Sequence, residues 1–159
     1  MTLYENVRRC FDYDPDTGAF TWKIRRSRIC VGNQAGHINS TGHFKVKLDG
    51  VDHMVHRLIW LWYYGELPKN FIDHINGIPH DNRIVNLRDV TNRVNQQNQR
   101  KANSLSTTGY LGVGKCGKRW RARIRTENGR LHLGVYGTPE EAHQAYLEAK
   151  RKLHEGNTL

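Results

Sequence analysis

The chain has 159 residues, with 25 Lys and Arg against 15 Asp and Glu, a formal net charge of +10. This length fits one ordinary domain or two small ones, and the positive charge favours a nucleic acid or an anionic membrane as partner. The longest apolar run, 58–64, is far shorter than the ~20 residues of a spanning helix. The N-terminus also lacks the basic and apolar regions of a signal peptide. We therefore expect a cytoplasmic protein that binds nucleic acid rather than a membrane.

Three cysteines are scattered along the chain, at Cys10, Cys30 and Cys116, and no two form a C-x-x-C pair. This spacing excludes a tetrathiolate zinc site, so we expect no structural zinc. An odd, scattered count is typical of reduced thiols, and we interpret each cysteine as a small buried or half-buried residue.

The first half of the chain predicts short strands followed by a helix. A turn-forming segment at 12–18 precedes a strand at 20–23, and alternating residues on both sides of Asp49-Gly50 indicate a hairpin. We expect one small antiparallel sheet over 20–55. The aromatic-rich segment 55–64 predicts a buried helix that ends at Gly65.

The next thirty residues predict two strands and a helix. Residues 71–74 suit a short strand, 76–82 a loop and 87–90 a second strand. Thr91 is a suitable N-cap for a helix that runs to Gln99.

The last third predicts a second module behind a linker at 101–108, where small polar residues predominate. We expect strands at 110–115, 119–126 and 130–136, then a helix at 139–153 that begins with Thr138 as N-cap, Pro139 and Glu141. Its apolar residues have helical spacing and are expected to face the sheet. The sequence therefore predicts an α+β protein with domains at 1–100 and 109–156.

The chemistry concentrates at Asp73-His74. Cutting a phosphodiester bond requires a water nucleophile, a base that takes its proton, and a cation that stabilises the departing oxygen. His74 suits the base, because imidazole titrates near working pH. Asp73 offers a carboxylate, and Asn95, on the predicted helix, offers an amide oxygen. Such oxygen donors suit Mg²⁺ or Mn²⁺ completed by water and substrate phosphate.

These residues resemble an HNH endonuclease motif of the His-Asn-Asn variety, which phage and intron-associated homing enzymes carry. The resemblance covers roughly residues 12–99 and lies in 73–77, 81–83, 86–88 and Asn95, with 55–60 and 65–68 upstream. It implies a ββα-metal fold in which His74 is the general base and Asp73 and Asn95 are metal ligands. It also implies that Asn86 orients the His74 strand and loop, and that the products carry a 3′-hydroxyl and a 5′-phosphate.

The neighbouring polar residues have simpler interpretations. Asn76, Asn82 and His80 are expected to build the loop through turn conformations and backbone hydrogen bonds. We interpret His56 as a packing or structural hydrogen-bonding residue. Arg93, near the predicted metal-bearing helix, is favoured slightly as a phosphate contact over a solvated position.

A second feature is the basic strand at 119–125, in which apolar and arginine residues alternate. Its side chains therefore divide between two faces, and Arg130 and His132 of the next strand extend the cationic one. Leu131, Leu133 and Val135 are expected on the packing face. A positive sheet can enter a major groove and contact phosphates and guanine edges. The expected DNA contacts are Arg121, Arg123, Arg125, Arg130 and His132.

Residues 109–155 resemble the plant Apetala/ethylene-response-factor DNA-binding domain. The matching segments are 109–113, 118–125, 133–136 and 138–146. The resemblance implies a three-stranded sheet on one helix, with the sheet bound in the major groove. Gly114 and His132 stand where Arg and Trp are common in that family, so the base preference cannot be transferred.

Together these patterns predict a two-module endonuclease that acts on double-stranded DNA with a divalent cation and without a small-molecule cofactor. A single segment of the HNH type, the one with Asp73-His74, suggests a monomer that nicks one strand. Two alternatives stay open: a DNA-binding regulator whose HNH module is inert, and a nuclease that acts on RNA or single strands.

Overall fold

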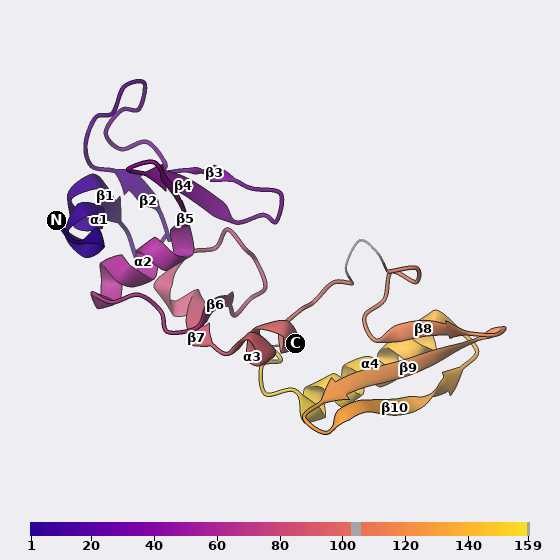
Figure 1. Ribbon diagram of the computed structural model, residues 1–159. Coiled ribbons are helices and arrows are strands. Elements are labelled where there is room, and N and C mark those ends of the chain that lie inside the picture. Colours follow the sequence, from indigo (N-terminus) through magenta and orange to yellow (C-terminus); the bar gives the residue numbers. More distant parts are fainter. Residues whose placement is uncertain (103–105, 159) are drawn as a thin grey trace. The chain divides into compact units, whose positions relative to one another are not determined.

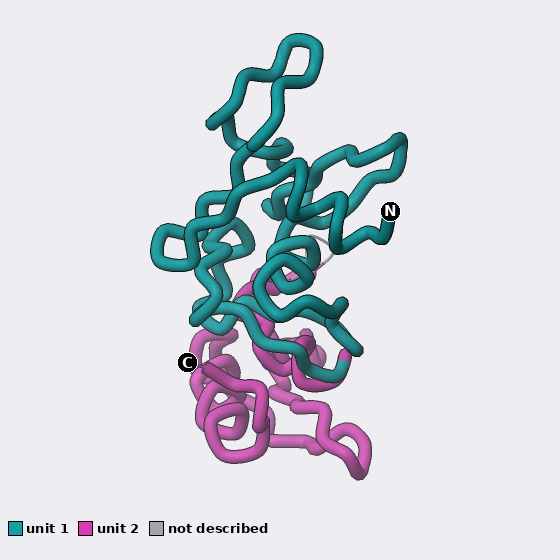
Figure 2. Tube along the Cα trace, turned by 90° about the vertical axis from the view of Figure 1, so that its left-hand side faces the viewer, with its two compact units in different colours: residues 1–91 teal, residues 92–159 magenta. Residues whose placement is uncertain are grey.

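The computed structural model describes residues 1–102 and 106–158. The chain folds as two units, residues 1–91 and 92–159 (Figure 2). Both combine helices with small antiparallel sheets (Figure 1), which agrees with the predicted α+β class. The domain limits at 1–100 and 109–156, with a linker at 101–108, stay a prediction, and three of the linker positions, 103–105, lie outside the described residues.

The first unit opens with a helix and a hairpin. Helix α1 (Leu3–Cys10) starts with a capping box in which the side chains of Thr2 and Glu5 bond each other's backbone N–H groups. Strand β1 (Phe11–Tyr13) follows directly and pairs antiparallel with β2 (Phe20–Trp22). The sequence does not predict α1 or β1. With eight and three residues, the two segments are too short to have a clear helix or strand pattern.

A separate three-stranded sheet comes next, in the order β3 (His37–Ile38), β4 (Phe44–Leu48) and β5 (Val51–Met54). The expectation of one sheet over 20–55 is therefore wrong, because β1 takes up the edge of β2 and the two form their own hairpin. Helix α2 (Val55–Tyr64) begins directly after β5. It ends, as predicted, at Gly65, whose φ of 81° closes the helix in the left-handed conformation.

The segment with the Asp-His pair forms a hairpin of β6 (Phe71–His74) and β7 (Leu87–Val90), as predicted. Its long connection contains a short 3₁₀ helix, η1 (Ile84–Asn86), which the sequence did not predict. In the register of the two strands, Asp73 lies opposite Arg88 and His74 opposite Leu87.

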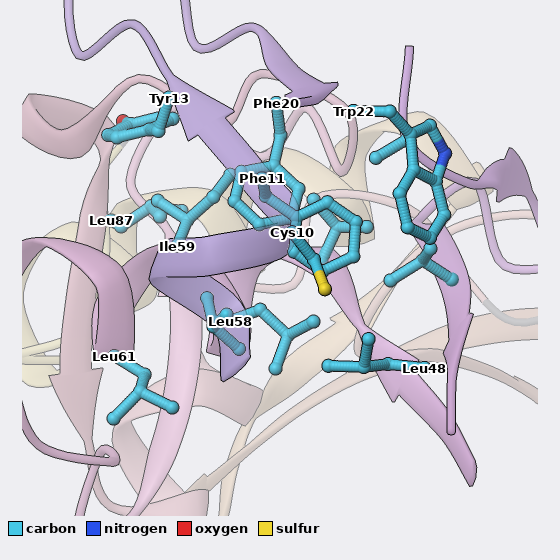
Figure 3. Packing of buried hydrophobic residues seen from close by; sticks show 14 of the residues in the cluster. Cys10, Phe11, Tyr13, Phe20, Trp22, Leu48, Leu58, Ile59, Leu61 and Leu87 are labelled. Carbon is cyan, nitrogen blue, oxygen red and sulfur yellow. The ribbon is translucent and has the colours of Figure 1, made fainter. Parts of the chain in front are cut away.

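One apolar core holds these elements of the first unit together (Figure 3). The rings of Phe11 and Phe20 stack with centroids 4.6 Å apart, and both side chains are fully buried. Leu58 and Ile59 of α2 and Leu87 of β7 belong to the same cluster. The core thereby fixes the start of β7 and the face of α2 on which the candidate site is built.

The second unit contains α3 (Asn92–Gln97), a sheet of β8 (Val113–Cys116), β9 (Arg119–Thr126) and β10 (Gly129–Tyr136), and α4 (Pro139–Leu153). β9 is the central strand, and α4 packs on one face of the sheet (Figure 1). α4 has the predicted limits and the predicted capping box of Thr138 and Glu141.

The first strand of this sheet starts three residues later than predicted. Gly112 has a φ of 72°, and a Cβ there would lie 2.0 Å from the ring of Tyr146 on α4. The backbone at 110–112 thus turns tightly against α4 before β8 begins, which requires a glycine.

A bulge in β10 corrects the predicted face of one residue. His132 pairs with Arg123, but Gly134 pairs with Ala122, so Leu133 has no opposite residue. Val135 therefore lies opposite Arg121 and shares the face of the arginines. The expectation that Val135 lies on the packing face, which followed from strict alternation, is wrong.

Two further expectations concern the whole chain. Among the described residues, the three cysteines form no disulfide, and Cys10 is buried, but Cys30 and Cys116 are exposed, contrary to the expected burial. No helix within the described residues is long and apolar enough to cross a membrane.

Candidate active site and basic sheet

Asp73 sits near the end of β6 and is held by its cross-strand neighbour. Its Oδ2 accepts bonds from Arg88 Nε at 2.8 Å and Arg88 Nη2 at 2.7 Å. The Asp73 side chain is only 7% exposed. These two contacts let Arg88 orient the Asp73 carboxylate, whose oxygens are of the kind that hard cations bind.

His74, the next residue, is a buried imidazole with a fixed orientation. Its Nε2 lies 3.2 Å from Asn82 Oδ1. Because an amide oxygen only accepts hydrogen bonds, this contact places the proton on Nε2 and the lone pair on Nδ1. Burial lowers the pKa of His74 from its ordinary value, although the Asn82 bond opposes the change. The ring is therefore neutral at pH 7, the state that a general base requires.

Asn82 is the orienting residue that sequence reasoning missed. It is almost completely buried, and its backbone oxygen accepts a 2.9 Å bond from the Tyr13 hydroxyl of β1. The turn at Gly18 also lies against this backbone: a Cβ on Gly18 would be 2.6 Å from Arg83 N. The β1–β2 hairpin thus supports the residue that orients His74. In the sequence, Asn82 is marked only as a polar residue eight positions after His74.

Asn86 ties the loop between β6 and β7 together. Its Oδ1 accepts from Asn76 N at 2.9 Å, its Nδ2 donates to Asp81 O at 2.7 Å, and its backbone oxygen accepts from Ile75 N at 2.9 Å. These contacts all go to backbone groups close to His74. The geometry is that of a positioning residue, and no contact suggests that Asn86 itself takes a proton.

Three histidines from separate elements meet in the first unit. His43 precedes β4, His56 lies on α2 and His74 ends β6, and a ring nitrogen of each lies within 4.8 Å of the others. Among the residues that the structure describes, these are the His, Cys, Asp or Glu side chains that form a group of at least three with ligand atoms close enough to hold a metal ion. The sequence did not point to His43, which lies 31 positions from His74.

The pKa values of all three histidines are lowered, in each case mainly by burial. For His56 the pKa falls to about 3, and the fields of His74 and His43 contribute to the decrease. For His43 the pKa is lowered by burial and then by His74. Three neutral rings therefore face one another at pH 7.

The remaining site residues lie in the second unit. Asn95 is half-buried on α3, and its role beside Asp73 stays a prediction. Arg93 on the same helix forms ion pairs with Glu127 and, at 3.6 Å, with Glu155. Its guanidinium is thus shared between two acids of its own unit. A phosphate would have to compete with both, which weakens the case for Arg93 as a DNA contact.

The basic sheet has the predicted cationic face. Arg125 lies opposite Arg130 and Arg123 opposite His132, and residues directly opposite in an antiparallel pair share a face. On the other face Ala122 and Ile124 are buried beneath α4. Gly114 of β8 lies opposite Arg121. The register thus places four arginines and one histidine on one surface of the sheet: Arg121, Arg123, Arg125, Arg130 and His132.

Comparison with known proteins places the Asp-His hairpin in a family context. No curated protein and no solved structure matches the chain. The family model described as HNH endonuclease matches residues 53–97, which run from β5 through α2, β6 and β7 to α3. The chain therefore contains an HNH endonuclease domain at residues 53–97.

Proposed function

We propose that this chain is a divalent-metal-dependent endonuclease of the homing type that hydrolyses DNA and leaves a 3′-hydroxyl and a 5′-phosphate. The observation that carries the proposal is the pair Asp73-His74 within the matched segment. His74 is buried, neutral and oriented by Asn82, while Asp73 next to it has a carboxyl group oriented by Arg88. This arrangement provides a proton acceptor beside a cation ligand.

His74 is the general base. With Nε2 bonded to Asn82, the Nδ1 lone pair takes the proton of the attacking water. Asn86 and Asn82 hold the loop and the ring in place, and we assign both a positioning role. Because burial lowers the pKa of His74, the ring is already neutral and does not first have to lose a proton. The bond to Asn82 fixes the tautomer, so that the lone pair is on Nδ1.

Asp73 and Asn95 are the proposed holders of the divalent ion, Mg²⁺ or Mn²⁺. A carboxylate and an amide oxygen are the donors that these hard cations prefer. For Asn95 the support is its donor chemistry and its place on α3. When bound, the ion supplies Lewis-acid stabilisation of the departing 3′ oxygen.

The basic sheet is the proposed DNA-binding surface, with a role like that of the Apetala/ethylene-response-factor domain. Its four aligned arginines and His132 can contact phosphates and guanine edges of duplex DNA. Because the HNH family model matches one segment of the chain, the one that contains Asp73-His74, we further propose that the protein acts as a cytoplasmic monomer that nicks one strand.

Cleavage of supercoiled plasmid tests the activity. With Mg²⁺ or Mn²⁺ we expect open-circle product first, and none with EDTA. Linear product without an open-circle intermediate would contradict nicking. Duplex binding without any cleavage in either metal would instead identify a DNA-binding regulator. Faster cleavage of RNA or single strands than of duplex would identify the other alternative.

His74→Ala tests the assignment of the base. We expect cleavage to fall by roughly 10²- to 10⁴-fold, because a positioned general base contributes that much, while duplex binding stays within twofold. His80→Ala is the matched control, since His80 is an exposed histidine of the same loop. Undiminished cleavage by His74→Ala would overturn the assignment.

A further inference from the structure

The three neutral histidines of the first unit form a nitrogen donor set, which differs in chemistry from the oxygen donors proposed for Mg²⁺. His43, His56 and His74 come from three different elements, and a ring nitrogen of each lies within 4.8 Å of the other two. Imidazole nitrogen is a preferred ligand of Zn²⁺ and related transition metals, whereas Mg²⁺ prefers oxygen. The cluster thus has the composition of a three-histidine zinc site.

Hydrogen bonds around His43 show which of its nitrogens carries a lone pair. Asn39 Oδ1 accepts bonds from the backbone N–H groups of Thr41 and His43, so this atom is an oxygen. Thr41 donates its hydroxyl proton to the same Oδ1 at 2.7 Å. The 3.0 Å contact between Thr41 Oγ1 and His43 Nδ1 is therefore donated by Nδ1–H, which leaves the lone pair on Nε2.

His56 supplies the second, independent observation. Its side chain is 7% exposed, and its Nδ1 is buried without a hydrogen-bond partner among the described residues. A buried polar nitrogen without a partner destabilises the fold, because the hydrogen bond that it makes to water in the unfolded chain is not replaced. A metal ion bound at this atom would remove that penalty. Plain core packing of the ring leaves the unpaired Nδ1 unexplained.

We propose that His43, His56 and His74 bind a transition metal ion of the Zn²⁺ type, and that this ion inhibits DNA cleavage by occupying the base. His74 Nδ1 has one lone pair, which cannot ligate a metal and accept a proton from water at the same time. The inhibitory part rests on the proposed function, whereas metal binding does not. No structural zinc was expected from the cysteine spacing and from the oxygen donors of Asp73 and Asn95, and the three histidines belong to neither group.

The geometry also sets the movement that binding requires. Zn–N bonds of 2.0–2.1 Å in a tetrahedral site put the donor atoms roughly 3.3 Å apart. The widest pair here can be up to 4.8 Å apart, so it would approach by up to about 1.5 Å. Rotation of the half-buried His43 ring can provide much of this, and the fourth position stays open to water.

Metal binding is measured first, on the full chain in a few millimolar Mg²⁺ so that oxygen sites are occupied. Zn²⁺ is titrated by calorimetry, and Co²⁺ by the visible absorption of its tetrahedral complexes. We expect one ion per chain.

His43→Ala should weaken binding at least about tenfold, since even outer partners of metal ligands contribute 10–100-fold. His37→Ala, an exposed histidine on β3, should bind like the wild type. Circular dichroism checks that both variants fold.

Cleavage is measured next, with Mg²⁺ fixed and Zn²⁺ increased. Each variant is compared with its own zinc-free rate. Wild type and His37→Ala should lose activity over the concentration range in which Zn²⁺ binds, and His43→Ala should require at least about tenfold more Zn²⁺.

The outcomes separate this inference from the proposed function. Unchanged Zn²⁺ binding in His43→Ala, or no binding by the wild type, would overturn the site. Binding that leaves cleavage unaffected would overturn its inhibitory role. A wild type that binds Zn²⁺ but never cleaves DNA with Mg²⁺ would refute the proposed function while leaving the metal site intact.

Discussion

The two units differ in how they place their charged and polar side chains. In the first unit, His74 and Asp73 are buried and each is held by a defined partner, Asn82 or Arg88. In the second unit, the positive charge of the sheet is repeated along two strands and stays in contact with solvent. Chemistry on a phosphodiester requires fixed geometry and a neutral base, whereas binding a polyanion requires charge. Single substitutions should therefore be costly in the first unit and graded in the second.

After His74→Ala, the largest effect is expected for Gly18→Ala. A Cβ at Gly18 would lie 2.6 Å from Arg83 N and 2.8 Å from Asn82 C, so the loop that orients His74 must move. A displacement of about 1 Å can cost a hundredfold in rate, and we expect a loss of that size in a plasmid nicking assay. Gly50→Ala is the control, because Gly50 also has a positive φ, of 84°, but has open space around it. Equal cleavage by the two variants would disprove the role of the hairpin.

The next effect concerns the pH dependence of stability in the first unit. Folding lowers the pKa of His56 from 6.5 to about 3. Between these values the unfolded chain holds a proton that the folded chain excludes, so stability falls as the pH falls. We expect His56 to contribute a slope of about 1.4 kcal/mol per pH unit below pH 6.5. Urea unfolding in EDTA at several pH values measures it. His56→Leu should have a smaller slope by that amount; an identical slope would contradict the argument.

A smaller, graded effect is expected on the arginine face. Arg123→Ala should weaken duplex binding roughly tenfold and reduce the slope of log K against log salt by about 0.9, because one phosphate contact is lost. Arg151→Ala is the control, since Arg151 is an exposed arginine of α4 in the same unit. Fluorescence anisotropy at several salt concentrations gives both quantities. Equal slopes for the two variants would exclude the sheet as the binding face.

The smallest effect is expected for Thr138→Ala at the start of α4. The Thr138 hydroxyl accepts a 3.2 Å bond from Glu141 N and caps the helix. Its loss should lower the free energy of unfolding of the second unit by about 1 kcal/mol. Urea unfolding monitored by amide hydrogen exchange in β9 measures this change. Thr138→Ser, which keeps the cap, should unfold like the wild type, and a comparable loss in Thr138→Ser would reject the capping explanation.

Strong local patterns were predictable from the sequence. The limits of α2, α4 and β9 follow from an apolar run, a capping box and strict alternation, which are all encoded within a few residues. The hairpin of β6 and β7 was predicted as well. α1 and β1 were not, because short elements owe their stability to packing against distant residues rather than to their own sequence.

By itself the sequence determined where the chemistry and the charge lie along the chain: Asp73-His74 in a segment of the HNH type, and arginines at alternate positions of a strand. Only the tertiary structure decided what surrounds them. It brought His43 and His56 to His74, placed Asn82 in contact with His74, and put Val135 on the arginine face through a bulge. The reason is physical: a residue type is local information, whereas burial, tautomer and register arise from contacts between segments that the core brings together.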